Sequence, residues 1–453
     1  MNENKMGTMP IGKLLLNMAL PMIASMMVQA LYNVVDSIYI SRVSESAVTA
    51  LSLAFPVQNM SIALASGIAV GVNSLLSRSL GEKRQDMANK AAGNGITLIM
   101  IAAGLLMLFG IFGARPYYEL QSNVEETVNG GSAYVSITSI LCIGCFFQVL
   151  FERLLQSTGR TIYSMITQGT GAIINIILDP IFIFGYFGVP KMGVAGAAIA
   201  TVIGQCIAAS LAIYFNIKRN PDIELGVKYM KPESLVVKNI LVVGIPSMVM
   251  MAIGSVMNFG MNQIFQSFSE TATGVFGIYY KLQSFFFMPL FGMNGATISI
   301  VAYNYGAKRK DRMMQAVKIA ATAAFCIMMA GLLAFQIIPQ VLLGIFNPSD
   351  EFLVIGTAAL RIISIHFPVA AFCIVFGAVF QALGNGIYST VVSLGRQLVV
   401  LLPVAYVLSL TGSVNNVWWA FPIAEIASLI LSVFFFKKIY TERIAVLPDV
   451  ETA

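Results

Sequence analysis

The sequence predicts an all-helical polytopic membrane protein in which twelve transmembrane helices form two parallel six-helix bundles. Of its 453 residues, 57% are hydrophobic and 11% are charged, whereas soluble domains carry about 25% charged residues. Long apolar runs follow one another along the chain, and each can cross a bilayer as a helix. The second half of the chain repeats the first at an offset of 225 residues, as from Gly81 to Gly306. These three observations exclude a soluble globular protein.

Twelve apolar runs give the expected helices, since each has the roughly 20 or more residues that a span requires. They cover residues 14–40, 46–76, 88–113, 130–155, 162–184, 193–217, 236–266, 272–303, 313–339, 352–381, 388–410 and 413–436. The first run follows Lys13 and is too long for the core of a signal peptide, and it lacks a small-residue cleavage site. It is therefore interpreted as the first transmembrane helix.

The basic residues determine the expected orientation. With a cytoplasmic N-terminus, 20 of the 27 lysines and arginines fall in inner segments, four lie within or near helices, and three fall outside, at Arg42, Arg115 and Lys191. Inner segments of membrane proteins carry such an excess. We therefore expect a protein of the plasma (inner) membrane with both termini in the cytoplasm. This orientation accounts for the net charge of +6 without a nucleic-acid partner.

The internal repeat divides the chain into two halves. Several identities share the offset of 225 residues and lie in equivalent places: Pro21 with Pro246, Gly81-Glu-Lys-Arg-Gln-Asp86 with Gly306-Ala-Lys-Arg-Lys-Asp311, and Gln156-Ser-Thr-Gly159 with Gln381-Ala-Leu-Gly384. Because six helices are an even number, both halves start on the same side of the membrane, and the repeat is parallel. We expect an N-terminal lobe of residues 1–217, a cytoplasmic linker of residues 218–235, and a C-terminal lobe with a short cytoplasmic tail at 236–453.

The run at 162–184 contains an acid at membrane depth, in the motif Asn175-Ile-Ile-Leu-Asp179-Pro180. A spacing of four residues places the Asn175 amide and the Asp179 carboxylate on one helical face, and Pro180 frees a carbonyl near Ile176. An isolated carboxylate at this depth costs at least ~2.5–3.5 kcal/mol. The motif therefore indicates a site for a proton, a metal ion or a cationic ligand. A structural acid capped by a neighbouring helix is the alternative.

Asp36 is the second acid expected at this site. Tyr32 lies one turn before it on the same helical face, and the helices of Asp36 and Asp179 both run outward, with their acids near the outer end. The two acids can therefore meet in one pocket. Neighbouring carboxylates repel, so they retain a proton or hold a cation. The oxygens of Asn175 and Thr201 suit Na⁺ as well as a proton.

The architecture indicates a transporter, because two parallel bundles leave a cleft between them and rocking gives alternating access. No nucleotide-binding fingerprint occurs, which argues against an ATP-driven pump, and no cofactor other than a coupling ion is expected. No catalytic constellation is visible, so an enzyme is not expected. Pro21 and Pro246 lie early in the first helix of each half. They indicate bending points, and ordinary tolerated prolines are the alternative.

Several motifs occur together in this chain: Pro21, Tyr32 and Asp36 in the first helix, the paired loops at Gly81 and Gly306, Gln156-Ser-Thr-Gly159 with Gln381-Ala-Leu-Gly384, the Asn175-x-x-x-Asp179-Pro180 motif, and Val417-Trp418-Trp419-Ala-Phe-Pro-Ile-Ala-Glu425. With them the chain resembles the multidrug and toxic compound extrusion (MATE) family over nearly its whole length. The resemblance is to the bacterial branch with acids in the N-terminal lobe. It implies a V-shaped pair of lobes that exports drugs and metabolites, often lipophilic cations, against an inward flow of Na⁺ or H⁺.

The resemblance also implies the residues of the coupling site. These are Asp36, Asn175, Asp179 and Thr201, with Tyr32 close by. Pro21 is the implied bending point, Na⁺ would bind Asp36 and Asp179, and a polar residue of the fourth helix, Gln148 or Glu152, completes the site. The implied partners are small amphipathic cations and the lipid bilayer. A monomer is expected, and antibiotic resistance is the implied physiological role.

The 25 methionines fit an adaptable apolar cleft. The candidate wall residues are Met257, Met261, Met288 and Met293, with ordinary membrane packing as the alternative. Glu425, in the last helix, is expected to pair with Lys281 or Arg396.

Two other transporter classes share features of this outline. A flippase or exporter of a lipid-linked precursor or metabolite from the same superfamily would need a cleft lined with basic residues, and the intramembrane Lys and Arg residues are few. A major-facilitator carrier has the same arrangement of six plus six helices, but that fold gives no reason for the motif at Asn175–Asp179. Both are therefore less favoured than the antiporter.

Overall fold

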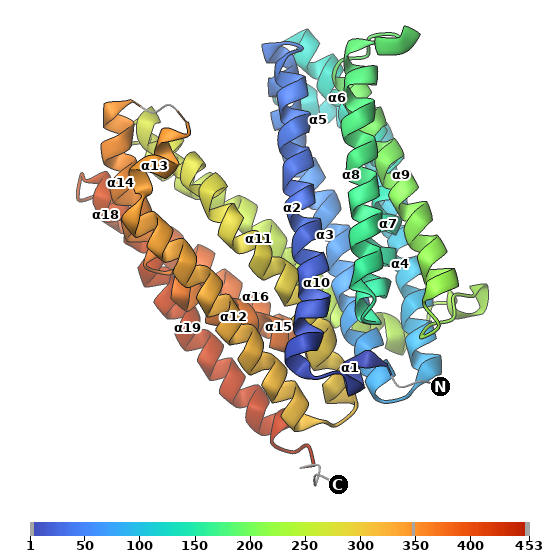
Figure 1. The fold of residues 1–453 in the computed structure, drawn as a ribbon. Helices are drawn as coiled ribbons and strands as arrows, with labels where there is room; N and C mark the ends of the chain where they lie inside the picture. The colour runs from blue at the N-terminus through green and yellow to red at the C-terminus, as the bar shows by residue number, and fades with distance from the viewer. Residues whose placement is uncertain (1–3, 347–348, 449–453) are drawn as a thin grey trace.

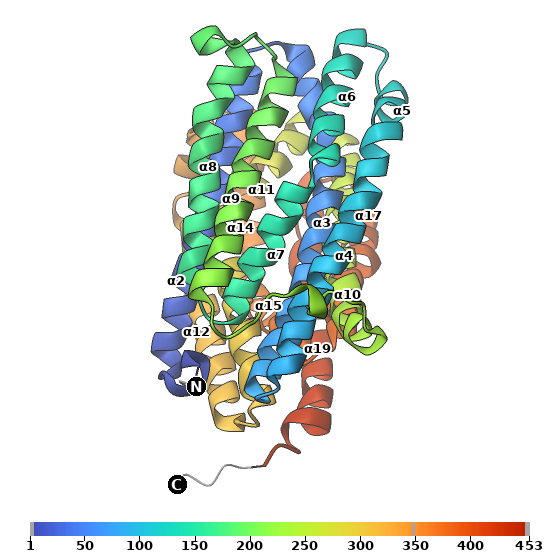
Figure 2. The ribbon, with the colours of Figure 1, turned by 90° about the vertical axis from the view of Figure 1, so that its right-hand side faces the viewer.

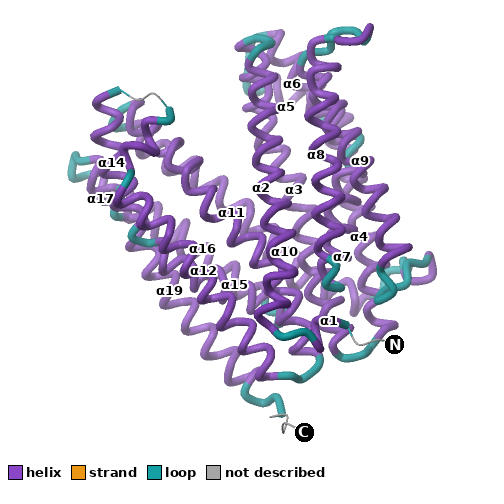
Figure 3. Tube along the Cα trace, in the orientation of Figure 1, coloured by secondary structure: helices purple, strands orange, loops and turns teal. Residues whose placement is uncertain are grey.

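The computed structural model describes residues 4–346 and 349–448, and these ranges contain helices but no strand (Figure 3). The long helices of the first half are α2 (Ile11–Ser41), α3 (Glu45–Gly81), α4 (Gln85–Phe112), α6 (Glu125–Ile140), α7 (Ile143–Ser157), α8 (Thr161–Phe184) and α9 (Val194–Arg219). Those of the second half are α10 (Ser234–Gln266), α11 (Glu270–Gly306), α12 (Lys310–Ile337), α14 (Asp350–Ser364), α15 (Phe367–Ala382), α16 (Gly386–Leu394), the π-helical η3 (Gly395–Leu401), α17 (Leu402–Ser409) and α19 (Ala420–Ile439). Short helices connect them: α1 (Lys5–Thr8), α5 (Ala114–Glu119), η1 (Tyr186–Gly188), η2 (Val227–Tyr229), α13 (Pro339–Gly344), α18 (Val414–Val417) and η4 (Tyr440–Ile444).

The twelve predicted spans are confirmed. In the described ranges, ten helical segments are long and apolar enough to cross a membrane, and the pairs α6–α7 and α14–α15 add two more when each counts as one bent span. The sequence predicted each of these two as one continuous run, but they bend by 47° and 49°. In the second pair Pro368 starts the new helix, because proline cannot donate to the preceding turn. In the first pair Gly144 brings the new helix against Cys206 of α9.

The two halves form the arms of a V, as the resemblance implied (Figure 1). One arm holds α2, α3, α4, α8 and α9, and the other holds α11, α12, α14, α15 and α19. The arms meet at the end that carries both termini and diverge at the opposite end. Figure 2 views the first arm from its outer side, where α8, α9 and α7 lie in front. Both termini therefore lie at the closed end of the V.

The repeat extends to the turns and caps that end the helices. Lys83 and its repeat mate Lys308 both have left-handed backbones, with φ of 58° and 56°. The N-cap of α3, Ser44, accepts from the backbone N–H of Ala47 at 3.0 Å. Ser269, its repeat mate before α11, makes the equivalent bond to Ala272 at 3.0 Å. Such side-chain caps satisfy an N–H that the helix leaves unpaired, so the same local signals form both halves.

Polar contacts join the arms at their closed end. The hydroxyl of Ser74 on α3 donates to the carbonyl of Gln381 on α15 at 2.7 Å. The Oδ1 atom of the buried Asn73 accepts from Ser157 on α7 at 2.8 Å and from Ser299 on α11 at 3.0 Å. Removal of one partner of such a buried hydrogen bond leaves the other partner unsatisfied, which destabilises the folded protein by more than the bond itself contributes. They make the closed end a defined interface between the arms.

The segment between the two halves lies along α4. Asn94, buried on α4, donates to the carbonyls of Tyr229 and Lys231 at 3.1 and 3.2 Å and accepts from the N–H of Glu233 at 2.8 Å. A second anchor is the ion pair between Arg160 and Asp222, at 3.1 Å. These side chains satisfy backbone groups that no regular element pairs, so the connection is docked.

Candidate ion-coupling and substrate site

Asp179 on α8 is fully buried, and Asn175 is its hydrogen-bond partner. The amide of Asn175 is best satisfied with its nitrogen donating to Asp179 Oδ2 at 3.3 Å. Its oxygen then accepts from the backbone N–H and the hydroxyl of Thr201 on α9, each at 3.2 Å. The one-turn spacing read from the sequence thus produces the expected shared face. Asn175 links the acid to the neighbouring helix.

Asp36 on α2 lies close enough to Asp179 for the two carboxylates to interact electrostatically. Its Oδ1 atom is buried and has no hydrogen-bond partner among the described residues. The hydroxyl groups of Tyr32 and Tyr134 also lie within electrostatic range of both acids. A buried carboxylate oxygen without a donor is costly. Such an oxygen is suited to a proton or to a hard cation.

Tyr134 on α6 was missed by the sequence analysis. It is buried, and its hydroxyl accepts from Gln58 on α3 at 2.5 Å. Neither residue belongs to a motif, and their helices are connected in sequence only through α4 and α5. The sequence gives no signal that brings them beside the two acids.

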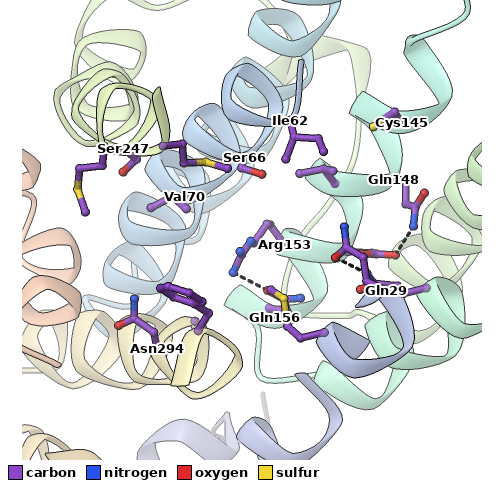
Figure 4. A pocket seen from close by; sticks show the side chains of 18 of the residues that line it. Gln29, Ile62, Ser66, Val70, Cys145, Gln148, Arg153, Gln156, Ser247 and Asn294 are labelled. Carbon is purple, nitrogen blue, oxygen red and sulfur yellow. Dashed lines mark hydrogen bonds between the residues drawn. The ribbon is translucent and has the colours of Figure 1, made fainter. Parts of the chain in front are cut away.

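A cavity of about 630 Å³ lies between the arms and reaches this site. Tyr32, Asn175 and Thr201 contribute to its wall, whereas Asp36 and Asp179 are not among the residues that line it. Side-chain amides from both arms also line it, from Gln29, Gln148, Gln156, Gln168, Gln205, Asn294, Gln381 and Gln397. Figure 4 shows Asn294 on one side of this cavity and Gln148 and Gln29 on the other. Amides both donate and accept, so this wall can bind varied polar groups.

The structure brings the two helix-four candidates, Gln148 and Glu152, together. Gln148, labelled in Figure 4, donates to Glu152 Oε1 at 3.1 Å. Thr167 on α8 donates to the same oxygen at 2.9 Å. Both residues line the cavity. Glu152 is therefore a hydrogen-bonded acid in the cavity wall, and the geometry gives no preference between the two for the coupling site.

Two of the four methionines predicted in the cleft wall lie elsewhere. Met257 and Met288 line a second cavity of about 510 Å³, on the side of the C-terminal arm. Met261 and Met293 line neither cavity; they are buried in the core of that arm. The prediction was wrong for Met261 and Met293 because it rested on composition, which does not show how a helix is rotated about its axis.

Glu425 forms a charged cluster in the C-terminal arm. Of its two predicted partners, the structure supplies Arg396, whose Nη1 atom lies 3.1 Å from Glu425 Oε2. His366 Nδ1 lies 3.5 Å from the same oxygen, and His366 Nε2 lies 3.4 Å from the hydroxyl of Tyr279. The Glu425 side chain is 3% exposed. A buried ion pair stabilises a fold only when its geometry is good and further hydrogen bonds satisfy its charges. Arg396 and His366 both lie close to the Glu425 carboxylate, so the cluster links the helices that carry these residues.

Pro21 lies within an unbroken α2. The proline leaves the carbonyl of Asn17, one turn earlier, without its helical donor. This carbonyl accepts a hydrogen bond from the hydroxyl of Thr161 on α8 at 3.3 Å, as is common for backbone groups that membrane prolines free. The bending at Pro21 stays a prediction, since this conformation has a continuous helix there.

Comparisons with known proteins agree with this fold. The sequence model of the MatE family matches residues 21–181 and 246–407. The multidrug export protein MepA of Staphylococcus haemolyticus is 24% identical over 425 residues, which cover 94% of this chain and 93% of that protein. MepA of Staphylococcus saprophyticus is 24% identical over 412 residues, covering 91% and 90%.

Two solved structures show the same architecture. A MATE transporter in complex with MaL6 superposes with a TM-score of 0.91 at 25% identity over 99% of both chains. An outward-facing MATE multidrug resistance transporter gives a TM-score of 0.90 at 24% identity, again over 99% of both chains. The family match covers both halves of the repeat, including the Asn175–Asp179 motif. This chain therefore belongs to the MatE family of multidrug and toxic compound extrusion transporters.

Proposed function

We propose that this multidrug efflux transporter is a secondary active antiporter, which exports amphipathic organic cations from the cytoplasm in exchange for H⁺ or Na⁺. The observation that carries the proposal is the pair of Asp36 and Asp179 next to the cavity. Asp179 is fully buried and is bonded to Asn175 of the cavity wall, and Asp36 lies within electrostatic range of Asp179. Two carboxylates at membrane depth repel unless a proton or cation is bound. Occupancy by the coupling ion therefore changes the free energy of this part of the protein.

The positive-inside bias supports a cytoplasmic position for the end at which the arms meet, so the V opens outward in this conformation. An ion arriving from outside neutralises Asp36 and Asp179 and allows α2 and α8 to pack more closely. In the proposed cycle α2 then bends at Pro21, the cavity shrinks, and the substrate is released. Ion binding can drive this step only if the ion binds the two conformations with different affinity.

The donor set suits either ion. Asp36 supplies an oxygen without a partner, Asn175 and Thr201 supply an amide and a hydroxyl, and Pro180 frees a backbone carbonyl of α8. Na⁺ is held by such neutral and anionic oxygens, and a proton needs only one of the carboxylates. Among the described residues, no group of three His, Cys, Asp or Glu side chains could hold a metal ion.

Efflux of a fluorescent lipophilic cation from loaded cells tests this proposal. Ethidium efflux would be compared for wild type, Asp36→Asn and Asp179→Asn, with and without external Na⁺ and with the proton gradient collapsed. Glu119→Gln is the matched control, because Glu119 is an exposed acid paired with Arg115. We expect wild type and the control to expel the dye and both variants to fail. Unimpaired efflux by Asp36→Asn and Asp179→Asn would contradict the proposal.

A second candidate is a flippase or exporter of a lipid-linked precursor, and one observation favours it. Arg153 and Arg396 both line the central cavity, so this cleft is more basic than the sequence analysis expected. Transfer of a fluorescent anionic phospholipid between the leaflets of proteoliposomes tests this function. Faster transfer than in protein-free vesicles, together with no ethidium efflux, would favour the flippase.

A further inference from the structure

Arg153 is a cation in the cavity wall that is not part of the proposed ion-coupling site. It lies on α7, lines the central cavity, and projects into it between the two arms (Figure 4). Its Nη1 atom donates to Gln156 Oε1 at 2.9 Å. No ion pair joins it to a carboxylate within the described ranges. Arg396, the other cavity arginine, is neutralised by Glu425 at 3.1 Å.

A charge without a counter-ion at membrane depth usually has a functional reason, because it costs several kcal/mol by most measures. The acid closest along the chain, Glu152, also lines the cavity. Its Oε1 atom is already engaged by Gln148 and Thr167. Apart from the bond to Gln156, Arg153 makes no side-chain hydrogen bond among the described residues, so its remaining guanidinium N–H groups are available to the cavity.

The guanidinium of Arg153 lies against a glycine of the opposite arm, Gly295. A Cβ atom on Gly295 of α11 would lie 2.9 Å from Arg153 Nη1. The missing side chain at Gly295 thus leaves the guanidinium against the opposite arm. Arg153 therefore lies where both arms contribute groups to the cavity, a region that we term the floor of the cavity.

Neutral polar groups also line the cavity near the guanidinium, beside Glu152, which interacts with it electrostatically. Gln156 and its repeat mate Gln381 line the same cavity, and so does Asn294, the residue before Gly295. The Oδ1 atom of Asn294 has no hydrogen-bond partner among the described residues, and the NH₂ group of the same amide carries two donors that a carboxylate can accept. A guanidinium fork with nearby amide N–H groups is the chemistry that recognises a carboxylate.

We propose that Arg153 binds an anionic group of the substrate, a carboxylate, at the floor of the central cavity. Export then extends beyond simple cations to amphipathic molecules that carry a carboxylate. The inference rests on the proposed export function, and it adds a site with a charge preference opposite to that of the acids in the N-terminal arm.

A matched pair of dyes tests the assignment. Rhodamine 6G is a cationic ester, and rhodamine 19 is the same fluorophore with the free carboxylate. Export of both would be measured for wild type, Arg153→Gln and Arg153→Lys in cells, and binding of both by fluorescence anisotropy with the purified full-length protein. Arg115→Gln is the control, since Arg115 is an exposed arginine paired with Glu119.

We expect Arg153→Gln to lower the ratio of rhodamine 19 to rhodamine 6G export, and the corresponding ratio of affinities, about tenfold, because a hydrogen bond to a charged group is lost. Arg153→Lys should restore part of the ratio, since it keeps the charge but not the planar fork. Arg115→Gln should leave the ratio as in wild type. An unchanged ratio in Arg153→Gln would overturn the anion site while leaving the exporter proposal intact.

Two further outcomes separate the inference from the proposed function. Export and binding of rhodamine 6G alone by wild type would overturn the anion site only. Absence of export for both dyes would contradict the proposed function, and binding of rhodamine 19 that weakens in Arg153→Gln would still support the anion site.

In proteoliposomes, an Arg153-dependent transfer of anionic phospholipid without any effect on rhodamine 19 would assign the guanidinium to lipid head groups and overturn the assignment to a solute.

Discussion

Gly81 and Gly306 each bring their helix against the backbone of the other's helix where the two arms meet. A Cβ atom on Gly81 would overlap the carbonyl oxygen of Tyr303, and one on Gly306 would overlap that of Arg78. Both pairs are related by the repeat of 225 residues, so the contact is two-fold symmetric. The closed end of the V therefore depends on two positions at which only glycine fits without displacement of a backbone.

Alanine at either glycine should weaken the closed end. Gly81→Ala or Gly306→Ala forces α3 and α11 apart, and overpacking of this kind costs about 1–3 kcal/mol. We expect lower thermal stability of the purified protein and slower dye efflux from cells. Gly277→Ala is the control in α11 itself, because a Cβ there meets no atom within 4 Å. Equal effects at Gly277 and Gly306 would show that the symmetric contact has no special role.

The Arg396–Glu425 pair should stabilise the C-terminal arm as a unit. Arg396→Met leaves the Glu425 carboxylate, which is 3% exposed, without its main counter-ion. Loss of one partner of a buried pair costs about 3–5 kcal/mol, and we expect less, about 1–3 kcal/mol, because the Arg396 side chain is 33% exposed.

Thermal unfolding followed by fluorescence-detected size exclusion measures this loss. The double variant Arg396→Met with Glu425→Gln removes the uncompensated charge, so it should recover most of the stability. A double variant that is less stable than both single variants would contradict a role as a charge pair.

Thr201 should tune the affinity for the coupling ion through Asn175. Thr201→Val keeps the side-chain shape but removes the hydroxyl that donates to the amide at 3.2 Å. Loss of one such bond is worth about 0.5–1.5 kcal/mol, so the half-saturating ion concentration should rise about two- to tenfold. The measurement is dye efflux as a function of external Na⁺ or H⁺. Thr170→Val is the control, because that hydroxyl bonds only to its own helix, at Ile166; an equal shift there would refute the specific role.

Asn94 should hold the segment that connects the two halves. Asn94→Leu removes three hydrogen bonds to the backbone of this segment, so the connection should open more often. Limited trypsin digestion should then cut after Lys228 and Lys231 faster than in wild type, while Asn129→Leu, at an exposed position of α6, should not change the rate. Unchanged cleavage in Asn94→Leu would contradict docking on α4.

Hydropathy predicted the transmembrane helices because it is a local property of the sequence, and the repeat predicted the two lobes because both halves carry the same motifs in the same order. A transmembrane span is determined by the length and apolarity of one segment. The motif on α8 is determined by a spacing of four residues, so Asn175 and Asp179 were expected on one helical face. The bends before α7 and α15 were not predicted, since they lie inside continuous apolar runs.

Contacts between distant helices were harder to predict. The position of Tyr134 near the two acids and the burial of Met261 depend on how each helix is rotated about its axis against helices far away in sequence. Amino-acid composition does not encode this rotation. Arg153 could have been found, because it interrupts an apolar run in the same way as the acids do. Its position at the seam against Gly295 required the structure.

Antiport through Asp36 and Asp179 is tested most directly in proteoliposomes that hold the purified transporter. An imposed gradient of Na⁺ or H⁺ should make wild type accumulate a cationic dye against its concentration gradient. Asp36→Asn and Asp179→Asn should lose this accumulation but retain the exchange of labelled for unlabelled dye, because neither acid lines the cavity. Gradient-driven accumulation by the two variants at the wild-type rate would contradict the account.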